Sequence, residues 1–416
     1  MTESTKGILR NVFSNKNILI VSLTTTMWSM CDNGWRTFWP LWMKNEMGAS
    51  VVIIGMLSMI RDSGPFLFQL PGGILADRFG RKKIIIYGTA LRFIPPVLYL
   101  TARTWEQTIP ALMLDALTQI YMPAFNAIVA DSLPSRQRGT GYGAYRMITS
   151  LPLVFMPVIG GVVMDSMGYA NGVKIFLYAE LIVAVAIVIL RYKYITETLE
   201  RKTEKPTDYT TRRESLSSTF NVPRTVWKMA VVSTASSFAS RLVMQLAPIY
   251  ARDVVHITNT ELGLASTLGS LISTTLALPG GMLADRTSRK RIILLPMIVS
   301  PLATFSVTLV SGFQQYLIVQ LINGTVMGVG GGAYGQTGGS AWQALLADLV
   351  PRQKRATVNG ILGTITGVMA APSSWIGGSL WETYTPETPF QLSLSFGYVA
   401  VVIFGIFVKE PKKGEE

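Results

Sequence analysis

The sequence predicts an all-α membrane protein of twelve transmembrane helices, arranged as two pseudo-symmetric bundles of six. Its 416 residues are 49% hydrophobic and only 15% charged, whereas a soluble protein carries roughly 25% charged residues. Apolar stretches of about 20 residues, the length that crosses a bilayer, recur along the whole chain. Lys and Arg are scarce in every second loop between these stretches, and blocks of sequence from the first half recur in the second half.

Twelve apolar stretches have the length of membrane-spanning helices. Several contain Gly or Pro, which membrane helices tolerate better than soluble helices do. The predicted spans are 17–43, 51–75, 84–103, 107–130, 140–164, 173–194, 227–251, 260–284, 292–311, 314–348, 356–380 and 389–408.

The net charge of +13 could indicate nucleic-acid binding, but its placement indicates membrane topology instead. Of the 37 Lys and Arg residues, 28 lie at the chain ends or around the loops that follow even-numbered spans. Basic residues collect on the cytoplasmic side of membrane proteins. Both termini are therefore expected in the cytoplasm, and no nucleic-acid partner is expected.

The inventory of reactive residues excludes several classes of enzyme and pump. The chain has one cysteine, Cys31, and one histidine, His256. These cannot build a cysteine-based metal site or a Ser-His-Asp triad, so we expect no metal and no cofactor. A Walker-type phosphate-binding loop is absent from the sequence, which argues against an ATP-driven pump.

Three sequence blocks of the first half recur in the same order in the second half. The first block reads PGGILADRFGRKK, and its second copy reads PGGMLADRTSRKR. The paired blocks are 71–83 with 279–291, 130–143 with 347–360, and 156–165 with 371–382. We therefore predict an N-terminal bundle over 1–195, a polar cytoplasmic linker over 196–222 and a C-terminal bundle over 223–416.

The offset between paired blocks increases within span 10, near the sequence GTVMGVGGGAYGQTGG, so the second copy carries an insertion there. A continuous helix over 314–348 would be about 52 Å long, against a bilayer core of about 30 Å. Span 10 is therefore expected to be tilted, kinked or broken at its glycines. Close helix packing and a flexible segment at a substrate site, around Gly330–Gly332, are the two alternatives.

The loop after span 2 resembles the signature of the major facilitator superfamily, Gly-x-x-x-Asp-Arg-x-Gly-Arg-Lys/Arg-Lys/Arg, and the resemblance extends over the whole chain. It implies the family's fold and a transporter that is not an enzyme. In that family the loop is a cytoplasmic gate, with Asp77 able to cap a helix or pair with Arg. The implied gating residues are Gly73, Asp77, Arg78, Gly80, Arg81, Lys82, Asp131 and Arg138, and in the second half Gly281, Asp285, Arg286, Arg289, Asp348 and Arg355.

Two details of the repeated motifs depart from the family pattern. Ser288 replaces the second glycine in the later loop, so its turn is expected to differ. Span 5 carries Pro157, Gly160 and Gly161, which resemble the Gly-x-x-x-Gly-Pro-x-x-Gly-Gly motif of the drug–proton antiporters. Leu153 and Met156 stand where that motif has glycine. A packing bend is the simpler interpretation of these residues.

Nine ionisable residues lie well inside the predicted spans: Asp32, Arg36, Arg61, Asp62, Arg92, Asp115, Arg146, Glu180 and Arg241. Each costs about 2.5–3.5 kcal/mol at a helix centre, so they must pair or face water. This requirement predicts a polar cavity. Arg92 and Glu180 fall on spans that are peripheral in the family, and we expect structural roles for them.

The remaining buried charges suggest a coupling site and a substrate site. Asp32, Asp62 and Asp115 are the candidate proton carriers, because a desolvated carboxyl can hold a proton near neutral pH. Static ion pairs with neighbouring arginines are the alternative. The substrate-cavity candidates are Trp28, Trp35, Arg36, Gln119, Arg146, Arg241 and Gln245.

The leading function hypothesis is a proton-coupled secondary transporter that exports amphiphilic, drug-like small molecules. The main alternative is a carrier of organic anions or phosphate esters that uses Arg36 and Arg241, and the third is a membrane receptor without transport. The expected partners are a small-molecule substrate, protons and the lipid bilayer, with the chain acting as a monomer. A prokaryotic plasma membrane fits the short loops.

Overall fold

The computed structural model describes residues 14–133, 138–199, 224–330, 342, 345–346, 349–350 and 355–408, and all regular secondary structure among them is helical. Two sets of sequence predictions fall elsewhere. Asp348, Gly331 and Gly332 lie outside the described residues. The side chains of Arg138, Arg146, Asp285 and Arg355 also lie outside the described part.

The described chain forms two compact units that do not follow the sequence halves throughout. Unit 1 comprises residues 1–50, 60–201 and 258–267, and unit 2 comprises residues 51–59, 202–257 and 268–416. The first turns of α4 (Val51–Phe79) belong to unit 2, and the first turns of α13 (Asn259–Arg286) belong to unit 1. The bundle and linker boundaries drawn from the sequence stay a prediction.

In unit 1 the predicted spans 1, 3 and 4 are each interrupted just before a proline. Span 1 forms α2 (Lys16–Arg36) and α3 (Trp39–Asn45), span 3 forms α5 (Arg81–Leu91) and α6 (Ile94–Thr101), and span 4 forms α7 (Trp105–Thr118), the 3-10 turn η1 (Gln119–Tyr121) and α8 (Met122–Ser132). Pro40, Pro95 and Pro123 each stand in the first turn of the following helix. Proline has no N–H for the preceding turn but fits a helix start.

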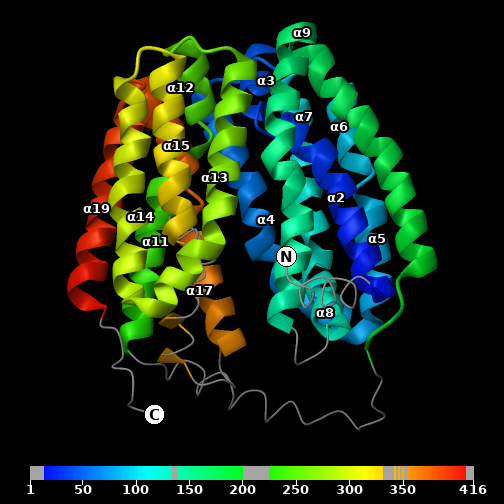
Figure 1. Ribbon diagram of the computed structural model, residues 1–416. Helices are drawn as coiled ribbons and strands as arrows, with labels where there is room; N and C mark the ends of the chain where they lie inside the picture. Colours follow the sequence, from blue (N-terminus) through cyan, green and yellow to red (C-terminus); the bar gives the residue numbers. More distant parts are fainter. Residues whose placement is uncertain are drawn as a thin grey trace. The chain divides into compact units, whose positions relative to one another are not determined.

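Spans 5 and 6 run through one assigned segment, α9 (Arg138–Tyr194), which is interrupted at Gly168. This residue has φ 75° and ψ 166°, a conformation open to glycine but costly for other residues. The interruption lets the chain reverse between the two predicted spans. In Figure 1 the two arms of α9 flank α2, and α5, α6, α7 and α8 belong to the same unit.

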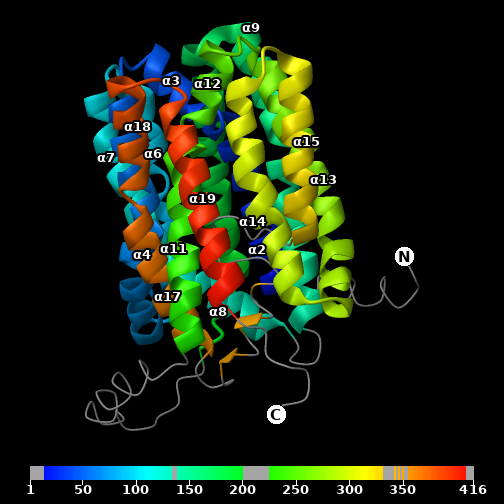
Figure 2. The ribbon, with the colours of Figure 1, turned by 90° about the vertical axis from the view of Figure 1, so that its left-hand side faces the viewer.

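Unit 2 contains the helices of the second half of the sequence, visible from two sides in Figures 1 and 2. Helix α19 packs along α11 and α14. A continuous apolar core, with Met229, Met297 and Phe404 fully or almost fully buried, holds them together. The helices are α11 (Arg224–Met244), α12 (Ala247–Asp253), α14 (Arg289–Ser306), η3 (Val307–Leu309), α15 (Phe313–Gly330), α17 (Arg355–Ala370), α18 (Ser373–Thr383) and α19 (Thr388–Phe407).

The sequence repeat is also a repeat of backbone geometry. The seven-residue helices α3 and α12 both follow a break in their span and both carry proline in the first turn. They end alike, with the N–H of Ala49 donating to Met43 O at 3.0 Å and the N–H of Ile257 donating to Ala251 O at 3.1 Å. These breaks are therefore a property of the duplicated unit rather than a local accident.

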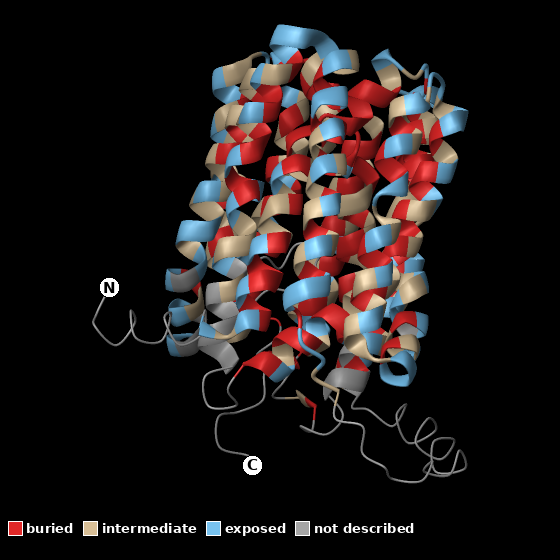
Figure 3. Cartoon of the chain, turned by 90° about the vertical axis from the view of Figure 1, so that its right-hand side faces the viewer, coloured by how far each residue is buried: buried red, intermediate tan, exposed pale blue. Residues whose placement is uncertain are grey.

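The outer faces of the helices are apolar and exposed, as a lipid-facing surface requires. Exposed and buried residues alternate around the helices in Figure 3. Ile182 is 74% exposed and Leu309 72% exposed, which would be unfavourable in water. Seven segments of the described chain have the length and hydropathy of a membrane span, and one of them, Met147–Tyr194, is 48 residues long and covers two predicted spans.

Glycines set the distance between α2 and α9. A Cβ built on Gly160 would overlap the carbonyl oxygen of Gly34 and would lie 2.9 Å from its carbonyl carbon. A Cβ on Gly34 would in turn overlap the Phe176 ring. Gly160 of span 5 is thus a site of close packing between α9 and α2.

The first turn of α13 is fixed to α9 within unit 1. The Asp165 carboxylate accepts hydrogen bonds from the N–H of Asn259 at 3.1 Å and from the N–H of Thr260 at 2.7 Å. Thr258 and Glu261 exchange reciprocal hydrogen bonds at the same helix start. The N-terminal donors of α13, which have no partners inside the helix, are therefore satisfied by side chains at this junction.

Candidate functional site

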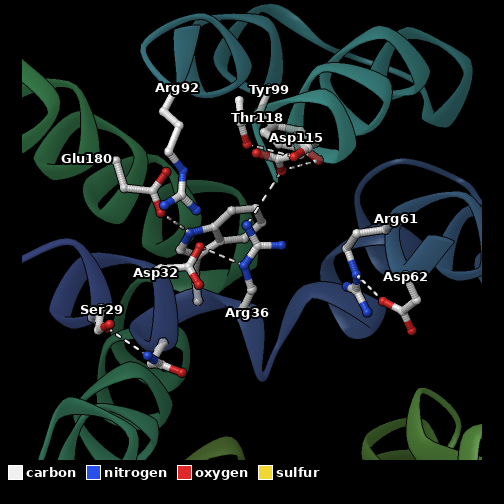
Figure 4. Close-up of polar contacts among 12 residues, drawn as sticks. Ser29, Asp32, Arg36, Arg61, Asp62, Arg92, Tyr99, Asp115, Thr118 and Glu180 are labelled. Atoms are coloured by element: carbon white, nitrogen blue, oxygen red, sulfur yellow. Dashed lines mark hydrogen bonds and ion pairs between the residues drawn. The ribbon is translucent and has the colours of Figure 1, made fainter. Parts of the chain in front are cut away.

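One arginine of unit 1 contacts two carboxylates (Figure 4). On α2, Arg36 Nε donates to Asp32 Oδ1 at 2.6 Å, and Arg36 Nη2 lies 3.5 Å from Asp115 Oδ2 on α7. Asp115 also accepts from the Tyr99 hydroxyl at 3.4 Å. Residues four apart on a helix share a face, which is why the sequence could predict the Asp32–Arg36 pair. The link to Asp115 required the fold.

A third carboxyl group joins this network through an aromatic donor. Trp35 Nε1 donates to Glu180 Oε1 at 2.7 Å, and Glu180 is only 2% exposed. The indole of Trp35 also meets Trp42 and Tyr99 edge to face, at centroid distances of 6.1 and 5.5 Å. Edge-to-face packing is the favoured geometry for such rings. The Trp35 side chain is therefore fixed both by its hydrogen bond to Glu180 and by its ring contacts with Trp42 and Tyr99.

The sequence interpretation gave Glu180 and Arg92 structural roles because their spans are peripheral in the family. In the structure both side chains lie beside the Asp32–Arg36 pair (Figure 4). Arg92 stacks over Trp28 at 4.1 Å and donates to the Tyr121 hydroxyl at 2.9 Å. A helix that is peripheral in a bundle can still direct one long side chain inward, and hydropathy alone does not show this.

One of the sequence candidates, Asp62, lies apart from this network. Asp62 accepts from Arg61 Nε at 3.0 Å, and Arg61 stacks over Trp39 at 4.8 Å. Figure 4 shows this pair to one side of Arg36. Gln119, at the interruption of span 4, is half-buried. The three proposed proton carriers therefore fall into two groups, with Asp32 and Asp115 in one and Asp62 in the other.

The substrate candidates of the second half lie in unit 2. Arg241 is in the last turn of α11, and its backbone carbonyl accepts a hydrogen bond from the Ser374 hydroxyl at 3.2 Å. Gln245 follows the helix and is 7% exposed. Both residues stand at the break that corresponds to the α2–α3 break of unit 1. Their role in binding stays a prediction.

The loop after span 2, which we call the first gating loop after the role predicted for it from the sequence, is fixed by contacts inside unit 1. Arg81 Nη1 forms an ion pair with Asp131 and donates to the Thr198 hydroxyl at 3.2 Å. The Glu197 carboxylate accepts from the N–H groups of Arg81 at 3.3 Å and Lys82 at 3.0 Å. It therefore caps the N-terminus of α5, directly after Gly80, whose φ is 97°. Asp77 and Arg78 are exposed on the last turns of α4.

The second gating loop has a different turn, as its sequence predicts. Ser288 has φ −72°, and its hydroxyl accepts from the N–H of Arg291 at 3.4 Å. It is thus an ordinary serine N-cap where the first copy has a glycine. Arg286 ends α13 and Arg289 begins α14, while Gly281 is half-buried in α13.

Sequence reasoning missed the contributions of Tyr99 and Glu197. Tyr99 is one of many aromatic residues at a span end, and nothing in its sequence context marks it. Glu197 lies in the polar stretch that was assigned to the linker. Its position just after span 6, at the end where the sequence predicts the basic loops, was the available signal.

Comparison with known sequences agrees with this architecture. The sequence model of the Major Facilitator Superfamily matches residues 19–258 and 229–416. An uncharacterized MFS-type transporter of Methanocaldococcus jannaschii is 21% identical over 401 residues, which is 95% of this chain and 94% of that protein. The quinolone resistance protein NorA of Staphylococcus aureus is 28% identical over 174 residues, which is 41% of this chain and 42% of that protein.

Comparison with solved structures gives the same fold. The nucleoside transporter NupG has a TM-score of 0.75 at 12% identity, over 94% of this chain and 100% of that one. A D-xylose–proton symporter has a TM-score of 0.71 at 14% identity, over 97% and 98%. The fold, the repeated sequence motif and the matches over both halves together show that this chain is a multi-pass membrane transporter, not an enzyme, and belongs to the major facilitator superfamily.

Proposed function

We propose that this transporter is a proton-coupled exporter of amphiphilic small molecules, embedded in a prokaryotic plasma membrane with both termini in the cytoplasm. The observation that carries the proposal is the Asp32–Arg36–Asp115 network beside buried aromatic rings. Carboxylates in a membrane interior that share one cation are suited to exchange a proton. The similarity of part of the chain to a quinolone resistance protein supports export of drug-like compounds.

The coupling step follows from the competition within this network. An arginine neighbour favours the ionised form of a carboxyl group, while burial favours its neutral form. The Arg36 guanidinium lies 2.6 Å from Asp32, so the two side chains form an ion pair in this state. Proton uptake at Asp32 therefore requires a second state of the protein in which Arg36 has moved away from it.

Reconstituted vesicles with an imposed pH gradient test this proposal. Wild-type protein should concentrate a cationic amphiphilic dye such as ethidium against its gradient. Asp32→Asn should lose this accumulation and retain downhill exchange, since the amide mimics the neutral acid. Asp253→Asn, a change at the outer end of α12, should accumulate the dye like the wild type. Accumulation by Asp32→Asn at the wild-type level would exclude Asp32 as the coupling residue.

A carrier of organic anions or phosphate esters is the second candidate. Arg36 of unit 1 and Arg241 of unit 2 support it, because guanidinium groups bind carboxylate and phosphate groups with two hydrogen bonds. Substrate charge separates the two functions. Competition for transport by organic anions, with loss of that competition in Arg241→Gln, would favour the anion carrier over the exporter of amphiphiles.

A further inference from the structure

The carboxyl group of Glu180 differs from the other acidic groups of the site in what surrounds it. Asp32 and Asp115 both lie within ion-pair distance of Arg36. Among the described residues, no cationic group lies within ion-pair distance of Glu180. The hydrogen bond that it accepts comes from the neutral donor Trp35 Nε1, at 2.7 Å. Within the described part of the chain, Glu180 is therefore buried beside a neutral donor and without a counter-ion.

A count of charges around Glu180 favours a bound proton. Arg36 pairs with two of the three carboxyl groups, and Arg92 is directed to Tyr121 and Trp28 instead. With all three carboxyl groups ionised, negative charge without a paired cation would lie away from water, which is costly. Protonation of the unpaired carboxyl group removes this negative charge and leaves the two ion pairs of Arg36 in place. The charged and titratable groups around Glu180 are Cys31, Asp32 and Arg36 from α2, Arg92 at the end of α5, Tyr99 from α6 and Asp115 from α7.

We propose that Glu180 is a proton-binding residue of this transporter, held as the neutral acid while Arg36 is bound to Asp32 and Asp115. This inference rests on the proposed proton coupling and adds a site that the sequence had set aside as structural. In the neutral acid, Oε1 is the carbonyl oxygen that accepts from Trp35, and Oε2 carries the proton. The indole of Trp35 thereby fixes which oxygen is protonated.

Loss of the proton changes the partner of Arg36. When the O–H bond of Glu180 breaks, the proton passes to water and the electron pair stays on Oε2. The new carboxylate attracts the guanidinium and competes with Asp32, which is one helical turn from Arg36 on α2. Protonation of Glu180 therefore controls whether Arg36 remains with Asp32, the contact whose opening the coupling step requires.

Infrared spectroscopy of the purified full-length protein tests this site without any transport measurement. A protonated buried carboxyl has a C=O stretching band separate from the carboxylate bands. We expect such a band at neutral pH in the wild type, with loss of the band in Glu180→Gln. The amide of that variant can still accept from Trp35. Glu106→Gln, a change at an exposed residue in the first turn of α7, should leave the band unchanged.

A second variant keeps the test decisive if Glu180→Gln fails to fold. Trp35→Phe removes the hydrogen bond to the carbonyl oxygen, so the band should shift to higher frequency. A band that is identical in wild type, Glu180→Gln and Trp35→Phe would place the proton elsewhere and overturn the assignment. Absence of the band from the wild type at neutral pH would also overturn it.

The dye-accumulation assay separates this inference from the proposed function. We expect Glu180→Gln to lose accumulation driven by the pH gradient, to a ratio of about one, and to retain downhill exchange. If the wild type itself does not accumulate the dye while the infrared band behaves as expected, the proposed function fails and the proton site stands. Full accumulation by Glu180→Gln would refute a role for Glu180 in coupling.

Discussion

Replacement of Gly160 by alanine should separate α2 from α9 and destabilise the protein. The new Cβ would overlap the carbonyl oxygen of Gly34, and it would lie 2.9 Å from the carbonyl carbon of Gly34 and 3.0 Å from Phe38 Cε2. The main obstacle is backbone, so rotation of a side chain cannot remove it. The two helices must move apart by on the order of 1 Å to restore ordinary contact distances.

The size of the effect follows from two opposed terms. Overpacking of a well-packed interior costs about 1–3 kcal/mol. Replacement of glycine by alanine within a helix stabilises the folded state by about 0.5–1 kcal/mol. We therefore expect Gly160→Ala to lose about 0.5–2 kcal/mol. Because Gly34 is adjacent to Trp35, the same displacement should weaken the Trp35–Glu180 hydrogen bond.

Thermal unfolding of the purified protein in detergent measures this effect, with Gly363→Ala as the matched control. Gly363 lies inside α17, and a Cβ there would meet no atom of the described residues within 4 Å. The control should therefore unfold at the wild-type temperature or slightly above it, and Gly160→Ala should unfold a few degrees below. Equal unfolding temperatures for the two alanine variants would show that close packing at Gly160 is not required.

Two further predictions concern helix ends. Burial raises the pKa of the Glu197 carboxyl, but hydrogen bonds from the N–H groups of Leu199, Lys82, Thr198 and Arg81 outweigh burial and hold the pKa below its ordinary value. The stabilisation is therefore present above the unfolded pKa of about 4.3 and is lost as pH falls through the lower folded pKa. Glu197→Gln should lower the unfolding temperature near neutral pH and approach the wild type in strong acid; a difference that is independent of pH would contradict the cap. His256 has φ 63°, a conformation that costs a non-glycine residue about 1–2 kcal/mol. His256→Gly should therefore raise the unfolding temperature slightly. A decrease in the unfolding temperature would contradict strain at this position.

The sequence was sufficient to predict the membrane spans. Hydropathy and the positions of basic residues are local features, and they do not depend on contacts between distant residues. It predicted the interrupted span 1 as one stretch over 17–43, since an apolar run does not show where the axis breaks. The position of Pro40 was the signal for that break, because proline fits the first turn of a helix and not its interior. The sequence repeat supports a break at this position, since Pro248 occupies the position equivalent to Pro40 in the second half.

The candidate site was predictable only where its members are close in sequence. Asp32 and Arg36 are one turn apart, and they form the expected pair. Asp115 is 79 residues from Arg36 and Glu180 is 145 residues from Trp35, so these contacts depend on how α7 and α9 pack against α2. Burial of Glu180 beside Trp35 is a feature of the fold that no sequence pattern indicates.

The two halves of the repeat preserve backbone geometry at one pair of equivalent loop positions and change it at another. Gly48 and His256 occupy equivalent positions after the C-termini of α3 and α12. They share a left-handed conformation, with φ 69° and 63°. Here the second half keeps the backbone and accepts strain in a histidine. Gly80 and Ser288 are also equivalent, yet their φ values are 97° and −72°. Ser288 caps its own helix, whereas α5 depends on Glu197 from beyond the end of α9. Among the described residues, an attachment of this loop to the chain beyond span 6 is seen in the first copy, where Gly80 offers no side-chain cap to α5.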